Sequence, residues 1–184
     1  MSIVVIEGSN GVGKTTIIDY LSKKYDIISK KSVSDWFRKY IEFARSCEPN
    51  IQKQIYLIGH EANYYESNDN KDYVFDRFAY STIIRLNYQL NKSVNETTNE
   101  ILTLNLKPKQ IFYITANKKT IQERLAIRNN FQFNENFYEY ENQVYLQLSQ
   151  IYDIISIINN DTNLDNAINE IDNIINRKKL FLRK

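Results

Sequence analysis

One glycine-rich stretch near the start of the chain limits its possible folds more than any other feature. The stretch consists of Gly8, Ser9, Asn10, Gly11, Val12, Gly13, Lys14 and Thr15. It fits the pattern G-x-x-x-x-G-K-[ST], in which a loop between a strand and a helix cradles phosphate groups. The apolar run 3–6 before it predicts a buried strand, and Ile17, Ile18 and Leu21 after it share one face of a helix. Strand, loop and helix therefore follow one another in the order that a phosphate-binding loop requires.

The residues of this loop have separate expected tasks. Glycines let backbone N–H groups turn inward around a phosphate, and the start of the helix adds its partial positive charge. Lys14 is expected to reach the β- and γ-phosphates, and the Thr15 hydroxyl is expected to ligate Mg²⁺. The chain is therefore predicted to bind a nucleoside triphosphate.

Short apolar strands alternate with helices along the rest of the chain. Further strands are predicted at 26–29, 73–75, 110–114 and 154–158, and helices at about 36–41, 50–66, 83–90, 117–129, 135–152 and 164–175. Such alternation is typical of a parallel sheet with helices on both faces. We therefore expect one domain spanning 1–184, with the three-layer α/β/α fold of P-loop NTPases around a five-stranded parallel sheet and with a helical lid.

The bulk composition restricts the class of partner. A length of 184 residues suits one domain with a substantial core, and the net charge of +2 gives no strong field to attract nucleic acid or a membrane. No apolar run approaches membrane-spanning length, no signal peptide precedes the first strand, and the single Cys47 excludes an internal disulfide. We expect a cytoplasmic protein without nucleic-acid or membrane partners.

Chemically active residues follow several of the predicted strands. Ligands of a parallel sheet bind beyond the carboxyl ends of its strands. Glu7, Asp76, Arg77 and the segment 115–117 fall at such ends, so we expect them to meet in one crevice. Asp76 is suited to hold Mg²⁺ or to orient an attacking oxygen, and Arg77 is suited to clamp an acceptor phosphate. The alternative interpretation is a structural salt bridge at the end of the strand.

Two later features favour phosphoryl transfer. Arg124 and Arg128 lie four residues apart on one helical face, where a bound anion would relieve their repulsion. A solvated charged face is the alternative. The segment 131–145 is polar and aromatic without a basic residue, and we expect a mobile lid at about 129–142 that shields the reaction from water.

Several motifs resemble those of the thymidylate kinases and the related deoxynucleoside kinases. The stretches A-N-Y-Y-E and V-F-D-R-F-A-Y-S are similar to the thymidylate kinase patterns A-N-R-W-E and V-D-R-Y-A-F-S. The similar segments are 3–8 with 13–16, 62–66, 74–81, 106–112, and 121–128 with 145–146 at the borders of the lid.

The resemblance implies an ATP- and Mg²⁺-dependent kinase that acts on a deoxynucleoside monophosphate. In such an enzyme the loop from Gly8 to Thr16 holds ATP together with Arg124, and Thr15 and Asp76 hold the metal. Arg128 supplies the arginine that neutralises the transferring phosphoryl group. The implied catalytic set is Lys14, Asp76, Arg77 and Arg128.

The acceptor side departs from the family pattern. Asn10 stands where the family has an acid that touches the acceptor sugar, and Tyr64 stands at the position of its base-reading arginine. His60 takes the position of the base-stacking phenylalanine. The arginine-proline turn after the second strand is absent, so a basic residue such as Arg38 would replace it. The implied acceptor-binding set is Glu7, Asn10, Arg38, His60, Tyr64 and Arg77.

Other functions fit parts of the sequence. A deoxynucleoside kinase shares Glu7 and the loop, although such enzymes usually carry Glu-Arg-Ser where this chain has 76–78. A regulatory GTPase would need an acid at the position of Thr120. A non-catalytic nucleotide-binding relative is compatible with the altered acceptor positions. As helical faces do in this family, the apolar helix at 50–66 could form a homodimer.

Overall fold

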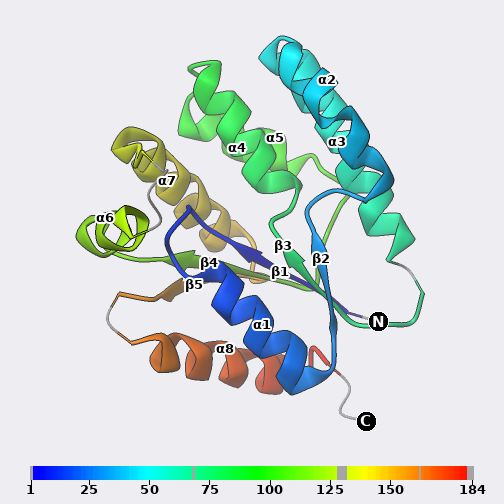
Figure 1. Ribbon diagram of the computed structural model, residues 1–184. Coiled ribbons are helices and arrows are strands. Elements are labelled where there is room, and N and C mark those ends of the chain that lie inside the picture. Colours follow the sequence, from blue (N-terminus) through cyan, green and yellow to red (C-terminus); the bar gives the residue numbers. More distant parts are fainter. Residues whose placement is uncertain (1, 68, 128–131, 162, 182–184) are drawn as a thin grey trace.

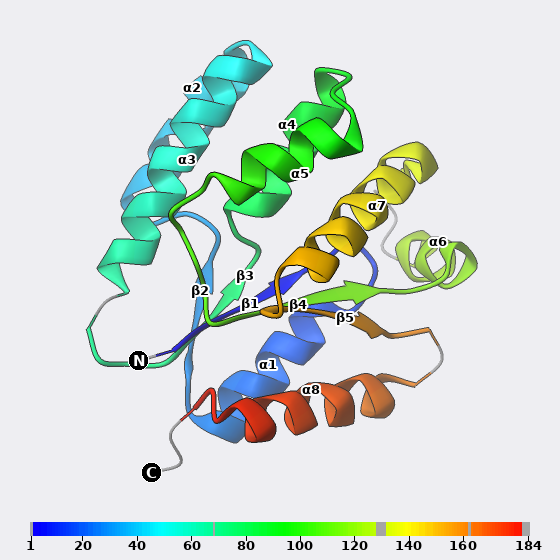
Figure 2. The same ribbon diagram turned by 180° about the vertical axis from the view of Figure 1, so that it is seen from behind.

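The computed structural model has one sheet of five parallel strands with helices on both faces (Figure 1, Figure 2). It describes residues 2–67, 69–127, 132–161 and 163–181. The strand order is β2-β3-β1-β4-β5, so β1 is central. The strands are β1 Ile3–Glu7, β2 Ile28–Lys31, β3 Tyr73–Asp76, β4 Gln110–Thr115 and β5 Ile155–Asn159. The predicted α/β fold with a five-stranded parallel sheet is confirmed.

Helices connect the strands and form the two outer layers. They are α1 Lys14–Tyr25, the short 3₁₀ helix η1 Trp36–Tyr40, α2 Ile41–Ser46, α3 Pro49–Glu66, α4 Ala79–Gln89, α5 Val94–Leu102, α6 Lys118–Ala126, α7 Glu135–Ile151 and α8 Leu164–Lys178. Pro49 begins α3, where its missing N–H removes no helical hydrogen bond. Ser93 and Glu96 form a capping box at the start of α5. None of the helices in the described residues is both long and apolar enough to cross a lipid bilayer.

The central strand explains the layered arrangement. Val4 and Ile6 belong to a core that includes side chains of α1 and α8. Ile3 and Val5, which alternate with them, belong to a second core that includes side chains of α4, α5 and α7. Because successive side chains of a strand point to opposite faces, a strand that is apolar at every position needs cover on both sides. The carboxyl end of β1, which leads into the glycine-rich loop, is therefore held between two helical layers.

Several elements begin or end at other residues than predicted, including the two segments that follow α1. Strand β2 begins at Ile28 instead of residue 26, because Asp26 adopts a left-handed conformation (φ 51°) that ends α1. The helix expected at about 36–41 is divided into η1 and α2. Both differences lie at the end of an element, where local pattern is least informative.

Candidate functional site

The loop between β1 and α1 is packed tightly against its neighbours. Gly8 and Gly13 have φ values of 131° and 98°, which residues with a side chain rarely adopt. A Cβ atom at Gly8 would lie 2.2 Å from the carbonyl oxygen of Ile114, and one at Gly13 would lie 2.5 Å from Nδ2 of Asn160. Both positions therefore require glycine. The loop has the compact backbone that a phosphate cradle needs.

Lys14 begins α1 and folds back over the loop. Its Nζ donates hydrogen bonds of 2.8 Å to the carbonyl oxygens of Gly8 and Ser9. Burial, and then the nearby Arg77 guanidinium, lower the pKa of Lys14 to about 7. A polyphosphate bound beside Lys14 would favour the charged ammonium form.

Two side chains, one from α6 and one from the segment after β5, hold the loop in place. Asn160 Nδ2 donates to the carbonyl oxygen of Val12 at 2.8 Å. The backbone N–H of Asn160 donates to the carbonyl oxygen of Thr115, also at 2.8 Å. Arg124 of α6 donates to the carbonyl oxygens of Gly11 at 3.4 Å and Asn160 at 3.0 Å. Arg124 therefore lies beside the loop, and its contact with a nucleotide stays a prediction.

The end of β3 brings an acid and an arginine to the same edge. Asp76 Oδ2 pairs with Lys31 Nζ of β2 at 2.7 Å. Arg77 has a left-handed backbone (φ 72°), and its N–H donates to the carbonyl oxygen of Ile6 at 3.0 Å. Its Nη2 donates to Asn10 Oδ1 of the loop at 3.0 Å. No ion pair joins Asp76 to Arg77 among the described residues. A left-handed backbone at a residue other than glycine, as at Arg77, is strained, and such strain is concentrated at functional sites.

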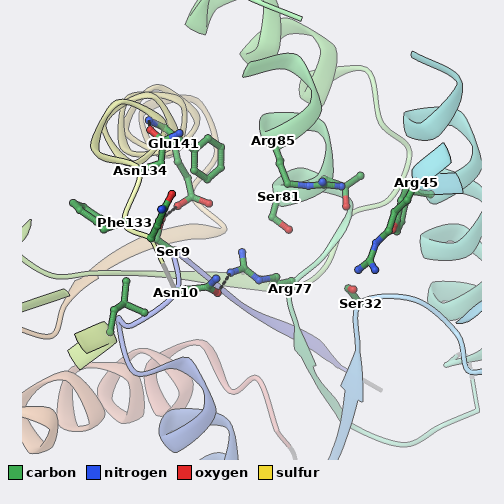
Figure 3. A pocket seen from close by; sticks show the side chains of 15 residues that line it. Ser9, Asn10, Ser32, Arg45, Arg77, Ser81, Arg85, Phe133, Asn134 and Glu141 are labelled. Atoms are coloured by element: carbon green, nitrogen blue, oxygen red, sulfur yellow. Dashed lines mark hydrogen bonds between the residues drawn. The ribbon is translucent and has the colours of Figure 1, made fainter. Parts of the chain in front are cut away.

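A cavity of about 420 Å³ lies beside the loop and Arg77 (Figure 3). Its lining residues come from the loop, α2, α4 and α7, among other segments. They include Ser9, Asn10, Arg45, Arg77, Arg85 and Glu141. Three guanidinium groups against one carboxylate give the described lining an excess of positive charge. The cavity is therefore suited to an anionic guest placed directly against the loop.

Two buried carboxyl groups lie beside the loop. Glu7 ends β1; its Oε1 accepts a hydrogen bond from the N–H of Phe78 at 2.8 Å, while its Oε2 has no partner among the described residues. Burial raises the pKa of Glu7 to about 8, although the Arg77 guanidinium opposes the shift. Glu141 of α7 accepts a hydrogen bond from Ser9 Oγ, and its Oε1 has no partner in the part that the structure describes. Buried ionisable groups of this kind are costly to stability and concentrate at functional sites.

His60 supports the cavity wall through hydrogen bonds. Its Nδ1 lies 2.7 Å from the carbonyl oxygen of Ser32, and its Nε2 lies 2.9 Å from Thr82 Oγ1. Burial lowers the pKa of His60 to about 4, so a neutral imidazole donates to the carbonyl and accepts from the hydroxyl. Both of these partners belong to residues that line the cavity. Direct contact between His60 and an acceptor stays a prediction.

Tyr64 and Arg38 also lie outside the lining of the main cavity. The Tyr64 hydroxyl donates to the carbonyl oxygen of Lys107 at 3.1 Å, and its ring packs against Phe78. Arg38 pairs with Asp35 at 3.0 Å and lines a separate cavity of about 270 Å³. The structure therefore does not place these two residues in the lining of the cavity beside Arg77, and their predicted contact with the acceptor stays a prediction.

The predicted lid is described only in part. Arg128, the predicted catalytic arginine, lies outside the described residues, as does the rest of the segment 128–131. Of the remainder, Gln132, Phe133 and Asn134 line the cavity. Helix α7 then begins, so the second half of the predicted lid is the first part of a packed helix.

The predicted magnesium ligands carry suitable donor atoms. Thr15 is exposed in the first turn of α1, as is Thr16, and Asp76 is half-buried at the neighbouring strand end. Hydroxyl and carboxylate oxygens suit Mg²⁺, which usually takes its other ligands from water and substrate phosphates. Lys31 would have to share Asp76 with such an ion. The donor set fits a metal that arrives with a nucleotide, and the assignment stays a prediction.

Three charged residues of the described lining had not been predicted as site residues. Arg85 interrupts the buried run of Ile83, Ile84 and Leu86, and a charge within an apolar helical run is a signal that could have identified it. Arg45 and Glu141 carry no such signal, because isolated charged residues on helices are normally solvated. Only the packing of α2 and α7 beside the loop gives these residues a role.

The chain resembles several solved structures. The thymidylate kinase from Candida albicans, described as having broad substrate specificity, matches with a TM-score of 0.75 and 17% identity over 97% of this chain and 92% of that one. The deoxyadenosine kinase from M. mycoides with bound dATP matches with a TM-score of 0.65 and 20% identity over 96% and 100%. With bound dCTP it matches with a TM-score of 0.60 and 21% identity over 95% and 99%. Both are P-loop kinases, and the likeness shows that this chain has their fold.

A scan against models of protein families found no match, and a search of curated proteins found none either.

Proposed function

We propose that this protein transfers the γ-phosphoryl group of ATP to the phosphate of a deoxynucleoside monophosphate, with Mg²⁺ as cofactor. The single observation that carries the proposal is the position of Arg77. Its guanidinium is hydrogen-bonded to the phosphate-binding loop and also lines the adjoining cavity. An anionic acceptor held by Arg77 would therefore lie next to a triphosphate held by the loop.

The donor side supports this proposal through the loop and Lys14. Backbone N–H groups at the start of α1 suit phosphate oxygens, and the Lys14 ammonium adds a charge that burial and Arg77 have made costly without an anion. Mg²⁺ bound with the nucleotide would neutralise charge on its β- and γ-phosphates. Arg124 beside the loop and Arg128 at the lid are proposed to complete the nucleotide contacts.

The acceptor side supports a phosphate in preference to an uncharged hydroxyl. The described lining of the cavity also includes Arg45 and Arg85, against the acid Glu141, so the cavity as a whole favours an anionic acceptor. Guanidinium groups bind phosphate oxygens in a bidentate manner, and they offer little to a neutral sugar hydroxyl that must first lose a proton.

A deoxynucleoside kinase is the second candidate, and Glu7 is the observation that favours it. Such an enzyme needs a general base for the acceptor hydroxyl, and burial raises the pKa of Glu7 to about 8, within the range useful for a base. The free Oε2 of Glu7 is buried, however, and Glu7 is not part of the cavity lining. We therefore favour the monophosphate acceptor.

The test is a panel of the common deoxynucleoside monophosphates and the matching deoxynucleosides, each incubated with ATP and Mg²⁺. Separation of the nucleotides should show diphosphates and ADP from the monophosphates. Arg77→Gln should raise the KM for the acceptor by about 10- to 100-fold, the effect of losing a charge-assisted contact. Arg177→Gln, an exposed arginine on α8, is the matched control and should leave the KM unchanged. Products formed from the nucleosides alone would favour the second candidate.

We also propose that the protein forms a homodimer through α3. Ile51, Ile58 and Tyr65 occur at seven-residue intervals on α3 and are 53%, 58% and 62% exposed. A repeat of this kind places the three side chains along one stripe that a second helix can cover. Sedimentation equilibrium should find a dimer for the wild type and a monomer for Ile58→Glu. A wild-type monomer at micromolar concentration would contradict the proposal.

The remaining elements of the proposed function concern location and partners. We propose a cytoplasmic location without nucleic-acid or membrane partners, in line with a net charge of +2. A gel-shift assay at low salt tests for nucleic-acid binding. A shift of oligonucleotides at micromolar protein concentration would contradict the proposed absence of a nucleic-acid partner.

A further inference from the structure

Two of the arginines in the cavity lie on the wall away from the phosphate-binding loop (Figure 3). Arg45 comes from α2 and Arg85 from α4. The Arg85 guanidinium lies over the ring of Tyr56 of α3, 5.9 Å from its centroid. Neither arginine forms an ion pair within the described part of the chain. This wall therefore presents positive charge without a protein anion.

The wall is separate from the place where an acceptor phosphate would meet Arg77. The Arg77 side chain is directed at Asn10 of the loop, with which it forms a hydrogen bond of 3.0 Å. Arg77 precedes α4, whereas Arg85 lies in the second turn of α4, and Figure 3 shows Arg45 and Arg85 on the side of Arg77 away from Ser9 of the loop. A phosphate seated beside the loop would thus leave Arg45 and Arg85 without a partner.

The surroundings of the wall increase the need for an anion. Burial, and then the guanidinium groups of Arg45 and Arg77, lower the pKa of Arg85. Glu141, the acid in the described lining, belongs to α7 and is hydrogen-bonded to Ser9 of the loop. A site for a neutral base is normally apolar with a few polar groups, whereas this one combines two arginines with neighbouring hydroxyl side chains.

We propose that Arg45 and Arg85 form a second anion subsite, and that the preferred acceptor carries another anionic group besides the phosphate beside Arg77. A phosphate on the sugar and a carboxylate on the base share the chemistry that two guanidinium groups recognise. The inference rests on the proposed function and narrows its substrate class to nucleotides that carry an anionic group in addition to the acceptor phosphate.

The test compares matched pairs of acceptors that differ by one anionic group. Deoxyadenosine 5′-monophosphate is paired with deoxyadenosine 3′,5′-bisphosphate, and deoxyuridine 5′-monophosphate with deoxyorotidine 5′-monophosphate, which differs from it by a carboxylate on the base. The member with the extra anion should have a kcat/KM about tenfold higher in one pair, the gain from a charge-assisted contact. A gain in the first pair identifies a sugar phosphate, and a gain in the second identifies a base carboxylate. The absence of a gain in both pairs would overturn the inference.

Substitution then links the preference to the two arginines. In Arg85→Gln and in Arg45→Gln the ratio of kcat/KM within the favoured pair should fall toward one, whereas Arg177→Gln should retain the wild-type ratio. Arg45 is exposed, so its variant serves even if Arg85→Gln fails to fold. An equal loss for both members would show that the arginines bind the same phosphate as Arg77.

If no acceptor is phosphorylated, the proposed function fails, and calorimetry of the bisphosphate with wild type and Arg45→Gln still tests the subsite.

Discussion

Replacement of Glu7 by Gln should stabilise the protein at neutral pH. In the wild type this carboxyl group is fully buried, and burial raises its pKa to about 8 from the ordinary value of 4.5. The folded protein therefore keeps the Glu7 proton at pH values where the unfolded chain has lost it. A Gln side chain has no charge to bury and retains an oxygen that accepts the hydrogen bond from the N–H of Phe78.

The size of the effect follows from the two pKa values. Because the folded-state pKa is raised, the contribution of Glu7 to stability is fully present below pH 4.5 and is lost as the pH rises toward 8. Deprotonation in the unfolded chain then costs the wild type about 3 kcal/mol of stability at pH 7 and about 1 kcal/mol at pH 5, at 1.36 kcal/mol per pKa unit. The stabilising effect of Glu7→Gln should therefore grow by roughly 2 kcal/mol or more between pH 5 and pH 7.

The assay is urea unfolding of the wild type and of Glu7→Gln at both pH values, followed by circular dichroism. Glu123→Gln changes an exposed carboxylate on α6 and is the matched control, for which the difference should stay near zero. An effect of Glu7→Gln that is the same at pH 5 and pH 7 would refute the reasoning. A gain in stability at neutral pH would also indicate that Glu7 is present for function, since it costs the fold free energy.

Two further substitutions test the loop. Lys14→Ala should lower kcat by on the order of 10²- to 10³-fold, because it removes a preorganised charge. Steady-state assays of ADP formation measure this loss. Activity within a few-fold of wild type would contradict the role of Lys14. Gly13→Ala should cost about 1–3 kcal/mol and weaken ATP binding, because its φ of 98° is strained for alanine and its Cβ would lie 2.5 Å from Asn160 Nδ2. Urea unfolding and calorimetry with ATP measure both effects, and wild-type values would show that the loop can relax.

The features predicted correctly from the sequence depend on short-range pattern. Four of the five strands are largely apolar runs, β2 being the exception with the sequence ISKK, and alternation with helices leaves few topologies other than a parallel sheet. The loop is likewise local, since Gly8 to Thr15 are contiguous and their conformation follows from glycine and from the helix that begins at Lys14. Arg77 could be placed beside the loop because both follow neighbouring parallel strands.

The lining of the cavity beside Arg77 depends on packing between distant segments, which local pattern does not specify. His60 and Tyr64 lie on the expected helix. In the packed helix, however, His60 is hydrogen-bonded to Ser32 and Thr82, and the Tyr64 hydroxyl is hydrogen-bonded to Lys107. The guanidinium and carboxylate groups of the cavity wall come together only once α2, α4 and α7 have packed around it. The spacing of these residues in the sequence does not predict that their side chains line one cavity.

The most direct test of the central claim uses ATP labelled in its γ-phosphoryl group, with Mg²⁺ and the panel of deoxynucleoside monophosphates. The label should appear in a deoxynucleoside diphosphate, and Arg77→Gln should lose this transfer at low acceptor concentration. Label found only in inorganic phosphate or only in products of unphosphorylated nucleosides would contradict the central claim.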